Sequence, residues 1–251
     1  MADRAQVSEE TYTRLFGARD TSAIEQDPEF MTMLRRLIFG DVFATGDLDD
    51  RSRELITVVV LTTMQTLPQL KAHTAAALNV GVSPIEVREA VYQCAPFIGF
   101  PRTLNALGVI NEVFTRHGVA LPLPDQGTTS EDDRFARGHE IQFPIYGDEI
   151  RDGLADLPDQ LGDALARLLT ESCFGDFYTR RALSLAQREL LVLCVLAALG
   201  GTDAQLRPHA AGNLKVGNSK GTQVAAMIHC YPYVGFPRAV NAIRIITALP
   251  D

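Results

Sequence analysis

The chain has 251 residues, of which 46% are hydrophobic and 22% are charged, a composition typical of a globular protein that can bury a sizeable core. Its formal net charge of −8 opposes binding to nucleic acid and to acidic membrane surfaces. No stretch approaches the roughly 18 apolar residues of a membrane helix, and the polar first residues do not resemble a signal peptide. We therefore expect a cytoplasmic protein with no nucleic-acid or membrane partner.

Helical patterns follow one another along the first half of the chain. Residues 51–64 form a long apolar run that we interpret as a buried helix, with a buried strand as the alternative. Residues 67–80 predict an amphipathic helix that ends at Gly81. Residues 83–86, Ser-Pro-Ile-Glu, carry the signature of a capping box and start a third helix, and residues 103–114 predict a fourth.

The same pattern returns in the second half, where residues 174–249 align with residues 39–114. The stretch FIGFPRTLNA in the first copy meets YVGFPRAVNA in the second. A period of this length marks a whole module rather than a solenoid unit. No segment shows the sustained period-two alternation of strands. We predict an all-α fold of two tandem modules related by internal duplication, at residues 1–120 and 134–251, with a linker at 121–133 that is rich in proline, glycine and acidic residues.

One acid and one histidine recur in both copies. Glu54 and His73 of the first copy correspond to Glu189 and His209 of the second. Two consecutive helices joined by a short turn bring such residues together across an antiparallel hairpin. A carboxylate beside an imidazole fixes the ring tautomer and favours the charged ring, which suits a proton donor. The alternative is a glutamate that caps a helix and a histidine that binds a backbone carbonyl.

A further histidine has no counterpart in the first copy. His229 aligns with Gln93 and lies four residues before Tyr233, so both occupy one helical face if the helix continues through Pro232. We carry His229 as a candidate catalytic residue, with a core position as the alternative.

Two arginines, Arg102 and Arg238, follow a Gly-Phe-Pro turn at the start of a helix. The helix N-terminus and the guanidinium together predict a binding site for an anionic substrate. The alternative is a surface arginine or a salt bridge to the neighbouring copy. The remaining basic residues of interest are expected to be solvated or uninvolved: Arg53, Arg188, Lys71, Arg207, His117 and His139.

The sequence shows no cofactor or metal signature. It has no nucleotide-binding glycine loop, no nucleophile elbow and no paired-cysteine or H-E-x-x-H motif. The four cysteines form no C-x-x-C pair, and we expect them to be reduced core residues: Cys94, Cys173, Cys194 and Cys230. We therefore predict a function without cofactor or metal.

The first copy, over RELITVVVLTTMQTLPQLKAHTAAALNVGVSPIEVREAVYQCAPFIGFPRTLNAL, resembles the carboxymuconolactone decarboxylase family. The wider group includes alkylhydroperoxidases of the AhpD type. In the second copy, LLTESCFGDFYTRRALSLAQRELLVLCVLAALGG and LRPHAAGNLKVG resemble the decarboxylase branch more closely. The resemblance implies a compact helical module that assembles into hexamers, so a tandem chain would form a homotrimer of pseudo-hexameric shape.

The AhpD branch carries a cysteine pair that this sequence lacks. The matching positions hold Thr66 and Gln69 in the first copy and Thr202 and Gln205 in the second. A thiol peroxidase needs thiolate attack and disulfide closure. Because both cysteines are missing in each copy, we predict no peroxidase chemistry. An AhpD-like hydroperoxidase is kept only as the disfavoured alternative.

The decarboxylase branch implies further site residues. By resemblance, His209 matches the helix histidine of the family, His229 a second histidine, and Glu171 an acid; the first copy has Arg36 where the second has Glu171. We therefore expect the second copy to be nearer to a decarboxylase site. The predicted function is a cofactor-free carboxy-lyase that acts on a small anionic lactone of aromatic catabolism. A non-catalytic module that binds a small ligand is the remaining alternative.

Overall fold

The computed structural model describes residues 3–17 and 26–250, and every regular element within them is a helix, which confirms the all-α prediction. None of the helices in this part of the chain combines the length and apolar character needed to cross a bilayer. In chain order the helices are α1 (Arg4–Phe16), α2 (Pro28–Arg35), η1 (Arg36–Val42), α3 (Asp50–Met64), α4 (Leu67–Asn79), α5 (Pro84–Ile98), α6 (Phe100–Arg116), α7 (Arg134–Tyr146), α8 (Glu149–Gly153), η2 (Pro158–Gln160), α9 (Leu161–Leu168), η3 (Leu169–Tyr178), α10 (Leu185–Leu199), α11 (Asp203–Lys215), α12 (Lys220–Val234) and α13 (Phe236–Thr247).

The local signals in the sequence account for the helices that carry the candidate pairs. The apolar run is helix α3, which begins where the Asp49 carboxylate accepts a hydrogen bond from the Ser52 amide at 2.8 Å. Helix α4 is followed by Gly81, whose φ of +85° lies in the left-handed region that glycine adopts at low cost. Ser83 and Glu86 form the predicted capping box of α5. Helix α12 continues through Pro232.

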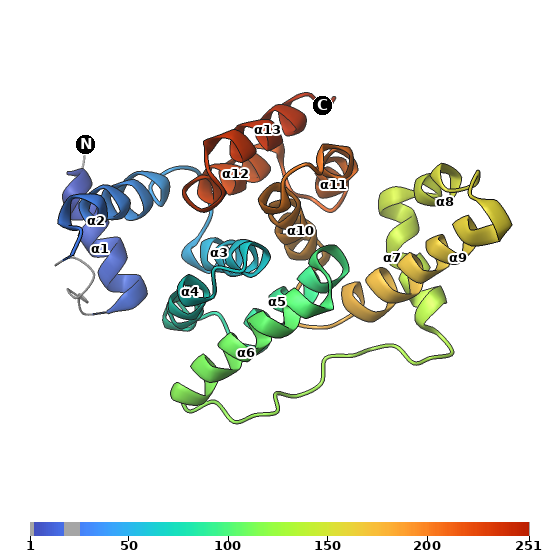
Figure 1. The fold of residues 1–251 in the computed structure, drawn as a ribbon, viewed down its shortest axis with the longest axis horizontal. Coiled ribbons are helices and arrows are strands. Elements are labelled where there is room, and N and C mark those ends of the chain that lie inside the picture. Colours follow the sequence, from blue (N-terminus) through green and yellow to red (C-terminus); the bar gives the residue numbers. More distant parts are fainter. Residues whose placement is uncertain (1–2, 18–25, 251) are drawn as a thin grey trace.

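The two copies share one hydrophobic core. Helix α3 packs against α10 and α12, and α5 packs against α10, so each copy inserts helices beside those of the other. Figure 1 shows these helices together in the middle of the molecule, with α1 and α2 at one end and α7, α8 and α9 at the other. Val58, Leu193 and Met227, none of them exposed, belong to one continuous cluster. The junction between the copies is therefore core rather than surface.

The duplication reaches further toward the N-terminus than the sequence alignment. Helices α1 and α7 have 13 residues each, and each packs against a π-helix, η1 or η3, at the matching place. Arg4 pairs with Asp41 at 2.6 Å, and Arg134 pairs with Asp176 at 2.9 Å. The last residue of α1, Phe16, therefore corresponds to the last residue of α7, Tyr146.

The chain between Arg116 and Arg134 contains no helix but is tied to the core. The Arg88 guanidinium donates hydrogen bonds to the carbonyls of Leu123 and Pro124 at 3.1 and 2.8 Å. The Thr128 hydroxyl donates to the carbonyl of Thr179 at 2.9 Å. The connection is thus fixed along α5 and the end of η3.

Candidate functional site

The first acid–imidazole pair is formed as predicted. His73 on α4 places Nδ1 2.9 Å from Oε2 of Glu54 on α3. The carboxylate is fully buried and the imidazole nearly so. Because a carboxylate only accepts, Nδ1 carries the proton and donates a hydrogen bond to Glu54. This leaves Nε2 of His73 as the ring atom available to a ligand.

The surroundings of this pair are aromatic and incompletely hydrogen-bonded. The ring of Phe16 lies 5.3 Å from the His73 ring, and the ring of Tyr233, from α12, lies 5.7 Å from it. Oε1 of Glu54 and the hydroxyl oxygen of Tyr233 are buried and make no hydrogen bond of normal length with a described residue, although Thr57 lies close enough to the Tyr233 hydroxyl to oppose the rise of its pKa. Burial, and then the charge of Glu54, raise the pKa of Tyr233, so its hydroxyl stays protonated. Buried polar atoms without partners are costly and point to a ligand-binding role.

His229 joins this site from the second copy and does not approach His209. Its Nδ1 lies 3.4 Å from Nη1 of Arg53, and its Nε2 lies 2.9 Å from the Arg53 carbonyl and 2.8 Å from Oγ1 of Thr57. The carbonyl can only accept, so Nε2 carries the proton. Complete burial, and then the charge of Arg53, lower the pKa of His229 to about 3. The ring is therefore neutral, and both of its nitrogens are engaged.

Arg53 is one of the most deeply buried side chains, so the expectation that Arg53 and Arg188 are solvated is wrong. Its guanidinium donates to the carbonyls of Leu48, Val42 and Thr45 at 2.9, 3.1 and 2.8 Å. These carbonyls lie at the last residue of η1 and in the turn toward α3, and they satisfy the charge without a carboxylate. Arg53 thereby fixes the loop that precedes Glu54.

The second pair is built from the same two helix positions but is closed by tyrosines. Nδ1 of His209 lies 3.2 Å from Oε2 of Glu189. The hydroxyl of Tyr146 donates to Oε2 of Glu189 at 2.6 Å and lies 2.7 Å from Nδ1 of His209. The hydroxyl of Tyr178 donates to Oε1 of Glu189 at 2.7 Å. Burial, and then the charge of Glu189, raise the pKa of both tyrosines, so they remain donors. Both oxygens of Glu189 are thus occupied.

A set of exchanges between the copies explains the difference. Phe16 stands in the first site where Tyr146 stands in the second, and Phe43 corresponds to Tyr178. Both hydroxyls that saturate Glu189 are therefore missing around Glu54. At two other positions the sites also differ. Helix α12 contributes His229 and Tyr233 to the first site, and α5 contributes the aligned residues Gln93 and Phe97 to the second. Oε1 of Glu54 thus lacks the hydrogen-bond partners that both oxygens of Glu189 have.

Both sites are composite. The Phe97 ring, from the first copy, lies 5.6 Å from the His209 ring, just as the Tyr233 ring of the second copy contacts His73. The Gln93 amide oxygen accepts from Nη1 of Arg188 at 2.8 Å, the counterpart of the contact between His229 and Arg53. Each pair therefore lies beside a helix from the other copy. The sequence did not indicate this exchange of helices between the copies.

The other predicted site residues lie elsewhere. Glu171 on η3 pairs with Arg167 at 2.7 Å. The side chain of Arg102 is exposed at the start of α6. Arg238 donates to the carbonyl of Ala198, near the end of α10, at 2.6 Å. In the described part of the chain the structure therefore does not gather Glu171, Arg102 or Arg238 around either histidine pair, and their predicted roles receive no support from contacts.

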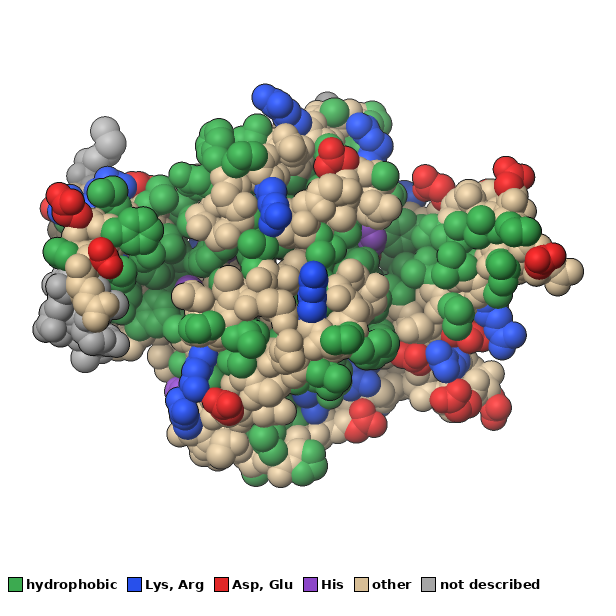
Figure 2. Space-filling model, in the orientation of Figure 1, with side chains coloured by type: hydrophobic (Ala, Val, Ile, Leu, Met, Phe, Trp, Pro, Cys, Tyr) green, Lys and Arg blue, Asp and Glu red, His purple; other side chains and the backbone are tan. Residues whose placement is uncertain are grey.

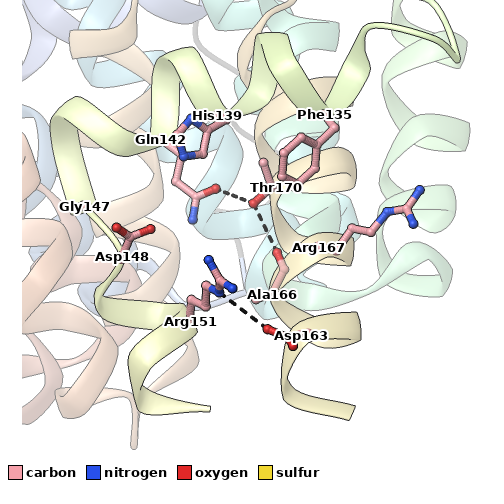
Figure 3. A pocket seen from close by; sticks show the side chains of 10 residues that line it. All are labelled: Phe135, His139, Gln142, Gly147, Asp148, Arg151, Asp163, Ala166, Arg167 and Thr170. Atoms are coloured by element: carbon pink, nitrogen blue, oxygen red, sulfur yellow. Dashed lines mark hydrogen bonds and ion pairs between the residues drawn. The ribbon is translucent and has the colours of Figure 1, made fainter. Parts of the chain in front are cut away.

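A cavity at the α7–α9 end of the molecule is also separate from the pairs. It has a volume of about 470 Å³ and lies between α7, α8 and α9. Figure 3 shows Arg151 of this cavity turned toward Asp163, and Thr170 turned toward Gln142. The charge of Arg151 is thus compensated by Asp163 within the cavity. Within residues 3–17 and 26–250, no three His, Cys, Asp or Glu side chains are grouped so that they could hold a metal ion.

The cysteines are placed as core residues. All four are buried and free. Burial raises the pKa of Cys94, Cys173 and Cys194, which opposes thiolate formation. None of them occupies the positions of the AhpD cysteine pair.

Comparison with known proteins finds a decarboxylase family and two relatives that are named as decarboxylases. The sequence profile of the carboxymuconolactone decarboxylase family matches residues 28–112 and 163–248. The chain is 29% identical over 92 residues to 4-carboxymuconolactone decarboxylase of Acinetobacter baylyi, across 37% of this chain and 69% of that protein. It is 33% identical over 69 residues to nitrosuccinic acid decarboxylase of Metarhizium robertsii, across 28% of this chain and 48% of that protein.

A solved structure extends the likeness to nearly the whole chain. This structure, from Burkholderia xenovorans, carries the provisional name gamma-carboxymuconolactone decarboxylase subunit. The match covers 98% of this chain and 97% of the other, with a TM-score of 0.58 and 20% identity, and shows a common fold.

Fold and site together define the class of the protein: a duplicated all-α protein in which two interlocked copies each hold a buried glutamate–histidine pair. The two profile matches fall one on each copy and together cover more than half of the chain. The chain therefore belongs to the carboxymuconolactone decarboxylase family, in a tandem form.

Proposed function

We propose that this protein is a carbon–carbon lyase that decarboxylates a small carboxylated lactone or a related acid at the first pair, Glu54 and His73, and not in the second copy, which the sequence favoured. One observation carries the assignment. Oε1 of Glu54 and the hydroxyl of Tyr233 are buried beside His73 without a hydrogen bond of normal length to a described residue, whereas both oxygens of Glu189 are hydrogen-bonded. A site that keeps unmet donors and acceptors out of water is prepared for a ligand that supplies their partners.

The geometry suits decarboxylation. When the bond between the carboxylate and its carbon breaks, CO2 leaves and the bonding electron pair enters the adjacent unsaturated system. The hydroxyl of Tyr233 can donate to the oxygen on which negative charge develops. Protonated Nε2 of His73 can then deliver a proton to carbon, while Glu54 holds the ring through Nδ1 and stabilises the imidazolium. Solvent returns the proton to the histidine.

His229 serves a different purpose in this proposal. Its ring is neutral, and both nitrogens contact Arg53 or Thr57, so it has no free atom to move a proton. It holds α12, and with it Tyr233, against α3; the rings of His229 and Tyr233 lie 5.9 Å apart on one helical face. We therefore treat His229 as a positioning residue and Tyr233 as the group that touches substrate.

The names of the relatives suggest which compounds to test. The relative from Acinetobacter baylyi is named for 4-carboxymuconolactone, and that from Metarhizium robertsii for nitrosuccinic acid. Both compounds are acids with an electron-accepting group near the carboxylate, which fits the chemistry above. Family membership and the two relatives support decarboxylation as the type of reaction, and the lactone is our first choice.

The experiment is CO2 release from each compound by the pure protein, with His73→Ala and His209→Ala compared in parallel. Loss of a general acid–base residue lowers kcat by about 10²- to 10⁴-fold, which we expect for His73→Ala. We expect His209→Ala to remain within about tenfold of the wild type, because the His209 ring belongs to the closed network. Circular dichroism checks that both variants fold.

Two alternatives make different predictions in the same experiment. An AhpD-like hydroperoxidase would consume hydroperoxide with a dithiol, and it is disfavoured because the four cysteines are buried and the cysteine pair is missing. A binding module would turn over neither compound. The homotrimeric assembly, the role in aromatic catabolism and the cytoplasmic location stay predictions.

A further inference from the structure

A second cavity lies beside the first site. It has a volume of about 430 Å³ and is lined by α2, η1, the start of α1 and Pro232 of α12. Its walls are mostly apolar, with the side chains of Phe30, Met33, Leu34, Leu37 and Ile38. On the face shown in Figure 2, hydrophobic side chains gather at the end of the molecule where α1 and α2 lie. Its volume is in the range that holds a small organic molecule.

The cavity contains one uncompensated charge. Arg4 is paired with Asp41 at 2.6 Å. The Arg36 guanidinium has no hydrogen bond or ion pair with any residue that the structure describes, and it is exposed. Its position in the second copy is taken by Glu171, which pairs with Arg167 four residues earlier. In the first copy that earlier position is Thr32. Both members of the ion pair have thus been exchanged, and the exposed side chain of Arg36 lines a mostly apolar cavity.

The cavity borders the pair through one layer of side chains. Leu34 and Ile38 line the cavity and also pack in the same cluster as Phe16 and Tyr233. Phe16 and Tyr233 are the two rings in contact with His73. Pro232, another lining residue, is the neighbour of Tyr233 on α12. A molecule in the cavity is therefore next to the aromatic wall of the first site.

We propose that this cavity binds the anionic end of a small apolar carboxylic acid, with Arg36 as the residue that selects the carboxylate. A guanidinium offers paired donors that match a carboxylate. The apolar walls accept the hydrocarbon part. As a substrate-selecting role the inference rests on the proposed function, but binding itself can be measured without turnover.

The binding test uses phenylacetate and its neutral counterpart phenylacetamide in ligand-observed NMR titrations of the full chain. We expect the wild type to bind phenylacetate at least about tenfold more tightly than phenylacetamide, as a charge-assisted hydrogen bond provides. Arg36→Glu should weaken phenylacetate binding at least about tenfold, because it replaces attraction by repulsion. Arg36→Lys should keep most of the affinity. Arg244→Glu, the same charge change at an exposed position on α13, is the matched control and should bind as the wild type does.

Three results would overturn the inference: no binding of phenylacetate to the wild type, equal affinities for the acid and the amide, or equal affinities of the wild type and Arg36→Glu for phenylacetate. Turnover separates this inference from the proposed function. If no variant releases CO2 but the binding order holds, the function fails and the Arg36 cavity stands. If CO2 is released and Arg36→Glu changes neither KM nor phenylacetate affinity, the cavity inference fails and the function stands.

Discussion

The neutral, buried state of His229 can be tested by a substitution that the protein itself provides. Gln93 occupies the matching position in the second site, where its amide oxygen accepts from Nη1 of Arg188 at 2.8 Å. His229→Gln should therefore keep the contact with Arg53. The substitution removes the imidazole, which titrates, and replaces it by an amide, which does not. At about pH 7 we expect the variant to be destabilised by no more than about 2 kcal/mol, as for a buried hydrogen bond that is replaced.

The pH dependence gives the magnitude. The folded pKa of His229 is about 3, against 6.5 for an unperturbed histidine. The unfolded chain therefore takes up a proton below pH 6.5 that the folded chain does not accept until about pH 3, so stability is lost as the pH falls through this window. Within this window each pH unit changes the free energy of unfolding by about 1.4 kcal/mol. From about pH 7 to about pH 4.5 the wild type should lose about 2 to 3 kcal/mol through His229 alone.

Urea unfolding of the wild type and His229→Gln at several pH values measures this term. All other titrating groups are common to both proteins, so the difference between their unfolding free energies isolates His229. As the pH falls from about 7 to about 4.5, we expect the unfolding free energy of the variant to rise relative to that of the wild type by about 2 to 3 kcal/mol. A difference that stays constant within about 0.5 kcal/mol across this range would refute the neutral, buried histidine.

Three further predictions address the two networks and the cysteines. Tyr233→Phe should lower kcat by about 10- to 100-fold with little change in folding, because it removes one donor to the developing oxyanion; an unchanged kcat would remove Tyr233 from the reaction. Tyr146→Phe should lower the free energy of unfolding by about 2 kcal/mol, because the buried carboxylate of Glu189 loses a donor; urea curves that coincide with those of the wild type would contradict the closed network. Iodoacetamide under native conditions should leave the thiols unmodified and CO2 release intact, because all four cysteines are buried; inactivation would reopen thiol chemistry.

The sequence was sufficient for the helices and for the first contact of each site. The internal repeat, the apolar run of α3 and the glycine after α4 all act locally, so they can be read from one chain. The recurrence of Glu54 with His73 then predicted a contact across the α3–α4 hairpin, and the 2.9 Å distance confirms it. These features depend only on residues that are near in sequence or joined by a short turn.

What the sequence did not reveal depends on packing between the copies. Nothing local to His229 indicates that α12 packs against α3 of the other copy, so His229 was grouped with His209. Arg53 precedes a glutamate in the first turn of a helix and reads as a solvated charge, yet three backbone carbonyls bind it in the core. The sequence did contain one indication that the two sites differ. Phe43 aligns with Tyr178, so the first copy lacks a hydroxyl that the second copy has.

The central claim is that the chain has one reactive pair, Glu54 and His73, completed by α12 of the second copy. The most direct measurement compares kcat for CO2 release by His73→Ala and His209→Ala on the same substrate. We predict a loss of about 10²- to 10⁴-fold for His73→Ala and a loss of less than about tenfold for His209→Ala. A larger loss for His209→Ala than for His73→Ala would contradict the claim and place the chemistry at Glu189.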